Sequence, residues 1–342
     1  MQKLTKKPNN GQPVVEEKKE EISEKKNEED VEKTHNKSVE KKKSEHIEEQ
    51  KKEKVTSTPK TLSKEKLETI KNTLNLTSDL TPNENRKYVV TKELTVSQVK
   101  KLGLSDEDLE LIEFTHLKLT KDDIENNKLI DEKGHCNVPS YVTKIDANAF
   151  KDNTDLKTIT LPQNLQDIGN SAFEGCTNLA LTSLPDGVKT IQYAAFYGCT
   201  NLALKSLPEN LTSIQNYTFS GCTNLALESL PEKLTTIGSV AFKGCTKLAL
   251  KSLPENLQEI GESAFYGCTN LALTSLPAGV TTIEFFAFKG CTSLSTLTFP
   301  KTLKDIKEYA FANCTNLKTL IFNGFLDSVA DNAFEDCPLD NV

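Results

Sequence analysis

From residue 136 to residue 342 the apolar positions of the chain repeat with a period of 23 residues. Each unit holds a leucine-rich segment that ends in proline, then an isoleucine, then an Ala-Phe segment that ends in Gly-Cys-Thr-Asn-Leu or a close variant. A fixed period of about 20 to 29 residues with leucines at set offsets predicts a repeat solenoid, in which each unit is one coil stacked on the next. The phenylalanines that mark the period are Phe173, Phe196, Phe219, Phe242, Phe265, Phe288, Phe311 and Phe334.

Each recurring column has an expected structural role. The leucines and isoleucines are predicted to point inward, in strands stacked about 4.8 Å apart as a parallel β-sheet. Proline lacks an N–H group, so it is expected where the strand has ended and the chain turns. Cysteine follows phenylalanine by three residues in eight units. One cysteine per unit at an equivalent position predicts a column of small buried side chains, with no disulfide between neighbouring units.

Five consecutive units depart from this pattern. They read L-A-L-x-S-L-P, as in Leu179 to Pro185, so the inner apolar residue comes at the third letter of the segment and not at the fourth. Because side chains alternate faces along a strand, this displacement predicts a bulge or a shifted register in the block. The last unit is also atypical, since Asn323 and Gly324 replace the proline turn and Val329 replaces isoleucine. We expect it to end the array without a separate cap.

The segment before the repeats has a different pattern. Leu67, Ile70 and Leu74 predict a helix that starts at the N-cap Ser63. Ser105 with an acidic residue three positions later predicts a second helix over 105–114, and 88–90 is a candidate short strand. Residues 60–135 are therefore expected to be a small helical N-terminal capping region that covers the first coil of the solenoid over 136–342.

Residues 1–59 are rich in lysine and acidic residues. Between Met1 and Lys54 there are 15 lysines and 14 acidic residues with few apolar positions. So little apolar surface cannot offset the entropy of ordering, which predicts a disordered Lys/Glu-rich tether. A single charged helix with i to i+4 ion pairs is the alternative.

Composition limits the classes of function. The remaining chain carries 27 basic and 35 acidic residues, and Arg86 is the only arginine, which argues against nucleic acid as a partner. The repeats contain no histidine and no motif for phosphate, zinc or a catalytic nucleophile, so no enzyme activity, cofactor or metal is expected. The sequence contains no run of about 20 apolar residues, so no membrane-spanning segment is predicted. Residues 1–13 lack the apolar core of a secretory signal.

The repeats resemble the BspA-type leucine-rich repeats. The family pattern of L-x-x-I-x-L-P followed by I-G-x-x-A-F-x-x-C matches Leu156 to Pro162 and Ile168 to Cys176 almost position for position. The resemblance implies a leucine-rich-repeat coil and a surface-exposed protein of a host-associated microbe that adheres to host matrix proteins or to other cells. It also implies a protein partner. The sequence leaves open the identity of this partner and the oligomeric state of the chain.

Two sets of residues are candidates for partner binding. The first is the exposed column of the five atypical units, for which a solvated face is the alternative: Thr182, Lys205, Glu228, Lys251 and Thr274. The second set gathers aromatic residues around the segment between isoleucine and phenylalanine, for which partial burial against the next coil is the alternative. These aromatics are Tyr193, Tyr197, Tyr217, Tyr266, Phe285, Phe286 and Tyr309.

Two functions remain open at this stage. The first is a non-catalytic adhesion scaffold at the cell surface or outside the cell, which requires a signal or lipid anchor upstream of this chain. The second is an intracellular scaffold that docks other proteins, and the unpaired cysteines suit the reducing compartment that it implies.

Overall fold

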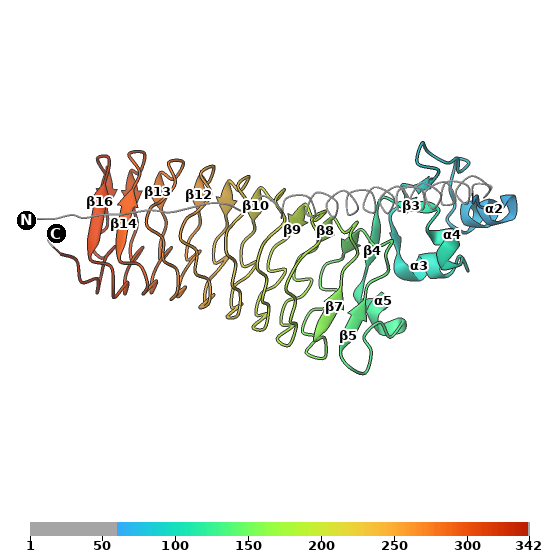
Figure 1. Cartoon of the computed structure of the whole chain (residues 1–342), viewed down its shortest axis with the longest axis horizontal. Helices are drawn as coiled ribbons and strands as arrows, with labels where there is room; N and C mark the ends of the chain where they lie inside the picture. The colour runs from blue at the N-terminus through green and yellow to red at the C-terminus, as the bar shows by residue number, and fades with distance from the viewer. Residues whose placement is uncertain (1–59, 341–342) are drawn as a thin grey trace, which may run out of the picture. The chain divides into compact units, whose positions relative to one another are not determined.

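A computed structural model describes residues 60–340, and residues 62–340 belong to one compact unit. This unit is a stack of coils whose strands lie side by side in parallel, as Figure 1 shows. The repeat solenoid with a stacked parallel β-sheet is therefore confirmed. The expected tether over 1–59 lies outside the described residues.

Short strands at the isoleucine column form the most regular part of the stack. Parallel pairing joins neighbouring strands 23 residues apart, as in Ile214 with Ile237 and Ile237 with Ile260, within three sheets that run from β6 to β9, from β10 to β12 and from β13 to β17. The isoleucines are buried while the residues before them lie nearer to solvent, so each coil from Ile145 to Ile306 places one apolar side chain into a continuous core. Val329, which replaces isoleucine in the last coil, is 44% exposed. The strands are β6 (Lys144–Ile145), β8 (Asp167–Ile168), β9 (Thr190–Ile191), β10 (Ser213–Ile214), β11 (Thr236–Ile237), β12 (Glu259–Ile260), β13 (Thr282–Ile283), β15 (Asp305–Ile306) and β17 (Ser328–Val329).

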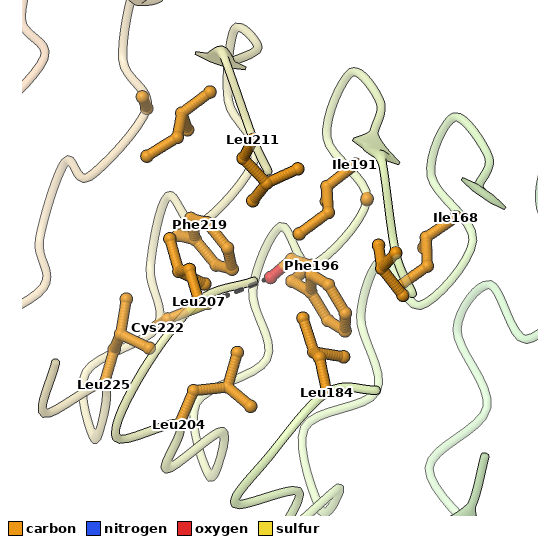
Figure 2. Close-up of a cluster of buried hydrophobic side chains, with 14 of the residues drawn as sticks. Ile168, Leu184, Ile191, Phe196, Leu204, Leu207, Leu211, Phe219, Cys222 and Leu225 are labelled. Atoms are coloured by element: carbon orange, nitrogen blue, oxygen red, sulfur yellow. Dashed lines mark hydrogen bonds between the residues drawn. The ribbon is translucent and has the colours of Figure 1, made fainter. Parts of the chain in front are cut away.

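The phenylalanine column forms a stack of rings along the inside of the coils. From Phe150 to Phe334 neighbouring ring centroids lie 5.0–5.6 Å apart with interplanar angles of 2–10°. Figure 2 shows Phe196 and Phe219 among the leucines and isoleucines of their own and neighbouring coils. Phe334, at the end of the stack, is half-buried. The expected apolar interior is confirmed.

The cysteine column adds a second ladder beside the rings. Each thiol from Cys176 to Cys337 donates a hydrogen bond to the carbonyl of the phenylalanine in the preceding coil, over 2.9–3.2 Å. Figure 2 draws one of these bonds, from Cys222. Burial raises the pKa of the Cys176 thiol to about 12, so the thiol stays protonated at neutral pH.

Two turns in each coil use the left-handed backbone region. One lies directly before cysteine and holds glycine in six coils, such as Gly244 at φ 73°, and Asn313 or Asp336 in the last two. A Cβ at Gly244 would meet only the Cα of Gly221 at 4.0 Å, so the positive φ and not lack of space selects glycine here. The other turn precedes Ala-Phe and holds non-glycine residues at φ 51–62°, from Asn148 to Val240 and Tyr309. A β-branched residue such as Val240 is strained there.

The leucine-rich segment forms strands only at the two ends of the array. These strands are β5 (His135–Asn137) and β7 (Thr158–Thr160) at one end, and β14 (Thr296–Phe299) and β16 (Thr319–Phe322) at the other. The five L-A-L-x-S-L-P units between them have no strand in this segment. The predicted bulge or shifted register is therefore wrong, because the strand is absent from this block. Moving the inner leucine by one residue places two exposed residues between it and the last leucine, as in Leu181 to Leu184, which breaks the alternation at the position where the other units form a strand.

Residues 60–135 combine helices with strands. The helices are α2 (Lys64–Thr73), α3 (Val96–Lys100), α4 (Asp106–Leu109) and α5 (Lys121–Asn126), and the strands are β1 (Tyr88–Val90), β2 (Leu94–Thr95), β3 (Ile112–Phe114) and β4 (Leu117–Leu119). The side chain of Ser63 caps α2 as expected. Sheet β2-β4-β6-β8-β9 continues from this segment into the 23-residue repeats.

One prediction in this segment is wrong. The expected helix over 105–114 ends at Leu109, although the predicted capping box between Ser105 and Asp108 is present. Ile112 and Phe114 are buried on either side of the exposed Glu113, and this alternation places them in β3, which pairs in parallel with β1. The tertiary pairing thus overrides the local helical signal.

Candidate functional site

The charged column of the five atypical units lies in solvent. Thr182, Lys205, Glu228, Lys251 and Thr274 are all exposed, and none of them lies on a strand. Backbone hydrogen bonds join neighbouring coils here, from the Lys205 N–H to the Thr182 carbonyl and from the Glu228 N–H to the Lys205 carbonyl. Within residues 60–340 no ion pair joins these side chains, so their charges stay available to solvent or to a partner.

Three tyrosines form what we call the tyrosine patch: Tyr193, Tyr197 and Tyr217. The ring of Tyr217 lies 5.6 Å from that of Tyr193 and 6.3 Å from that of Tyr197. Tyr193 and Tyr197 are 49% and 44% exposed, whereas Tyr217 is half-buried between them. The backbone of Tyr217 has a φ of 62°, in the turn before Thr218 and Phe219. The stacked coils therefore hold two exposed rings against a third.

A shallow hollow lies beside this patch. Its volume is about 320 Å³, and Tyr193 lines it together with Lys189, Gln192 and Gln215 from the coils of β9 and β10. Apart from Lys189 and Tyr193, the lining side chains are amides, hydroxyls and Ile191. The hollow therefore offers hydrogen-bond donors and acceptors next to an aromatic ring, a combination that suits a polar partner surface.

The other aromatic candidates lie farther along the array. Phe286 and Tyr309 stack at 5.3 Å and 2°, and the Lys289 ammonium lies 5.5 Å and 5.0 Å from their ring centroids. The neighbouring Phe285 is 38% exposed, while Phe286 and Tyr309 are half-buried. Tyr266 is half-buried and contacts the Lys243 ammonium at 4.9 Å. In these cation–π contacts, a lysine of the same chain already covers part of each aromatic ring face.

The structure thus separates the aromatic candidates into groups. It brings together the three residues of the tyrosine patch, and it stacks Phe286 on Tyr309. Sequence reasoning missed the lysines at these sites. A usable signal was present, because Lys243 and Lys289 directly follow a core phenylalanine, in the slot that Tyr197 fills elsewhere.

Comparison with known families identifies the repeats. The model of the BspA type leucine rich repeat region matches residues 133–249 and 235–342, with six copies. The chain belongs to this family. Leucine-rich repeat proteins are generally non-catalytic and typically serve as protein-binding scaffolds, and the BspA-type chain described here has the solenoid such scaffolds use.

Solved structures include bacterial leucine-rich repeat proteins that are similar to this BspA-type chain. A leucine-rich repeat protein from Bacteroides ovatus is 29% identical, with a TM-score of 0.46, over 61% of this chain and 50% of that one. A leucine rich cell surface protein from Faecalibacterium prausnitzii is 22% identical, with a TM-score of 0.44, over 82% of this chain and 87% of that one. The pneumococcal vaccine antigen PcpA is 19% identical, with a TM-score of 0.40, over 75% and 71%.

The chain spans half the length of the Bacteroides ovatus protein. No curated protein gives a significant match to the sequence. Over residues 60–340 the helices are too short or too polar to cross a membrane, and the same residues contain no cluster of histidine, cysteine and carboxylate side chains suited to a metal ion.

Proposed function

We propose that this BspA-type protein is a non-catalytic adhesion scaffold that binds a partner protein through the tyrosine patch. The observation that carries the proposal is the exposure of Tyr193 and Tyr197, at 49% and 44%, on coils held rigidly by the core. Tyrosine is enriched among the residues that dominate protein interfaces, because it offers a large contact area at a small cost in side-chain entropy.

The shape and charge of the molecule favour a protein as the partner. A solenoid offers an extended surface that contacts a large partner without a deep pocket. The acidic balance of the repeats and the single arginine disfavour nucleic acid. The amides and the lysine of the hollow beside Tyr193 provide polar contacts at the rim of an aromatic centre, which is the usual composition of a protein interface.

A location at the cell surface is part of the proposal. The family supports it, and the free cysteines no longer favour the intracellular alternative. Eight of the nine thiols are buried, and burial raises the pKa of the Cys136 thiol to about 12. Such thiols are unreactive, so they persist in an oxidising environment as well as in a reducing one.

Two measurements test the proposal. On intact producing cells, a membrane-impermeant biotinylation reagent should label the protein before lysis. The purified full chain should bind an immobilised basement-membrane extract in surface plasmon resonance, and Tyr193→Ala with Tyr197→Ala should weaken binding about 30-fold, as expected for interface hot spots. Tyr266→Ala, at a half-buried tyrosine outside the patch, is the matched control. The proposal would be rejected if the reagent labels the protein only after lysis. It would also be rejected if the Tyr193→Ala with Tyr197→Ala variant binds the extract as strongly as the Tyr266→Ala control.

A further inference from the structure

A second group of aromatic residues lies farther along the array, and we call it the phenylalanine patch: Phe285, Phe286 and Tyr309. The rings of Phe286 and Tyr309 stack at 5.3 Å with an interplanar angle of 2°, and Phe285 is 38% exposed. Like the tyrosine patch, this patch takes its rings from two neighbouring coils.

The two patches occupy equivalent positions of the repeat. Tyr193 and Phe285 both follow the buried isoleucine of their unit by two residues, and they lie four periods apart. Tyr217 and Phe286 both follow that isoleucine by three residues, and they lie three periods apart. Equivalent positions of a solenoid form columns along the stack, so both patches are on the same side of the array.

Backbone hydrogen bonds connect the patches along this side. In each coil the N–H of the residue at the positive-φ position before phenylalanine donates to a carbonyl of the next coil. The main chain therefore fixes the spacing between the patches. These bonds run over 2.8–3.0 Å from Tyr217 to Ser239, from Val240 to Glu262 and from Ser263 to Phe285.

The spacing follows from the advance of each coil. Neighbouring core rings from Phe196 to Phe288 lie 5.4–5.6 Å apart, so four coils separate Tyr193 from Phe285 by roughly 22 Å. A standard protein interface buries about 800 Å² on each partner, which is a surface roughly 30 Å across. One folded protein is therefore large enough to cover both patches.

The coils between the patches offer no third anchor of this kind. The columns of Tyr193 and Tyr217 hold serine, valine and glutamate there, at residues 239, 240, 262 and 263. Tyr266 of the same stretch is half-buried and contacts the Lys243 ammonium at 4.9 Å. This side of the array thus presents two aromatic anchors at a fixed distance.

We propose that one folded partner protein contacts the tyrosine patch and the phenylalanine patch at the same time, through two apolar surface groups of its own that lie roughly 20 Å apart. The inference rests on the proposed function, because the tyrosine patch supplies the first of the two contacts. Once that contact is made, the second forms at a high effective concentration. The phenylalanine patch therefore raises the affinity, and the rigid spacing selects partners that match it.

The first test removes the second contact. On the same immobilised basement-membrane extract, Phe285→Ala in the full chain should weaken binding about tenfold, as expected for an interface hot spot. Phe322→Ala is the matched control, because Phe322 is a phenylalanine of similar exposure, at 42%, that lies in β16 outside both patches. It should leave binding unchanged.

The second test changes the spacing and keeps both patches. Deletion of residues 228–250 removes one complete 23-residue unit between the patches and joins Leu227 to Lys251, which preserves the register of the repeat. The patches then lie one coil closer, by about 5 Å. Binding should weaken about tenfold. Duplication of the same unit, which moves the patches one coil apart, should have the same effect, and far-ultraviolet circular dichroism should show that both variants are folded.

A combination of the two changes tests whether the patches act on one partner. In the deletion variant the second patch no longer reaches its contact, so adding Phe285→Ala should weaken binding less than twofold further. Adding Tyr193→Ala and Tyr197→Ala to the deletion variant should still weaken binding about 30-fold, because the first contact is intact.

Three results would overturn the inference. The first is wild-type binding by Phe285→Ala. The second is wild-type binding by the folded deletion and duplication variants, which would mean that the patches bind separate molecules or a flexible partner. The third is an equal loss on Phe285→Ala with and without the deletion. If the Tyr193→Ala and Tyr197→Ala variant is weakened in each of these cases, the proposed function stands and only the second contact is rejected.

Discussion

The stack of phenylalanine rings gives the most direct test of how the solenoid is stabilised. Phe242 is fully buried, and its ring lies 5.6 Å from that of Phe219 and 5.4 Å from that of Phe265. Truncation to alanine removes roughly 150 Å² of buried aromatic surface, which at about 25 cal/mol per Å² corresponds to about 4 kcal/mol. Large-to-small substitutions in protein cores cost a similar amount, about 3 to 5 kcal/mol. We therefore expect Phe242→Ala to lower the free energy of unfolding by about 4 kcal/mol.

Urea denaturation followed by far-ultraviolet circular dichroism measures this change. Phe334→Ala is the matched control, because Phe334 is half-buried and stacks on Phe311 alone. It should cost about half as much, roughly 2 kcal/mol. In a repeat array each coil contacts only its neighbours, so the mid-array substitution should also broaden the transition by separating the two halves. Equal losses for both variants, or no loss for Phe242→Ala, would refute the assignment of this column to the core.

Three other substitutions or treatments test particular features. Val240 has a φ of 61°, whereas Asn148 holds the equivalent position in an earlier unit. Val240→Asn should therefore raise the free energy of unfolding by about 1 kcal/mol in urea denaturation. A loss of that size would show that the contacts of the valine side chain outweigh the backbone strain. Burial raises the pKa of Asp123, but hydrogen bonds from Ser97 and Thr120 outweigh it and hold that pKa below its ordinary value. The charged form therefore stabilises the fold above about pH 4 and loses this effect as pH falls through the lowered pKa. Asp123→Asn should cost about 2 kcal/mol at pH 7, and its unfolding midpoint should approach that of the wild type in acid. A constant difference between the two midpoints from pH 7 to pH 2 would contradict the assignment. Iodoacetamide should modify only the half-buried Cys337 in the native protein, since the other eight thiols are buried, and intact-mass analysis showing uniform labelling, or disulfides between neighbouring coils, would contradict the buried column.

Part of the structure followed from the repeats alone. The columns of phenylalanine, isoleucine and cysteine identified the coil and its core, because an apolar residue that recurs at a fixed offset has to meet its own copy when coils stack. The same logic distinguishes the five atypical units, because their inner leucine is displaced by one residue. The candidate binding aromatics were also visible in the sequence, as large side chains in slots that hold asparagine, serine or glutamate in other units.

Other features depended on contacts between coils. The local sequence did not predict that α4 ends at Leu109 or that β3 starts at Ile112, because β3 is a strand only through its pairing with β1. The tyrosine patch formed from two coils, and the lysines on the aromatic faces were not expected, because ring packing depends on the rotation of each turn.

The amino-acid sequence by itself determined that this chain coils with a 23-residue period and which side chains fill the interior. The pattern of apolar residues within a single unit is enough to predict which of its side chains are buried. Only the tertiary structure decided which leucine-rich segments pair as strands, as β5 does with β7 and β14 with β16, and which form no strand. A hydrogen bond between coils requires two segments to lie in register, and the pattern of a single unit does not contain that information.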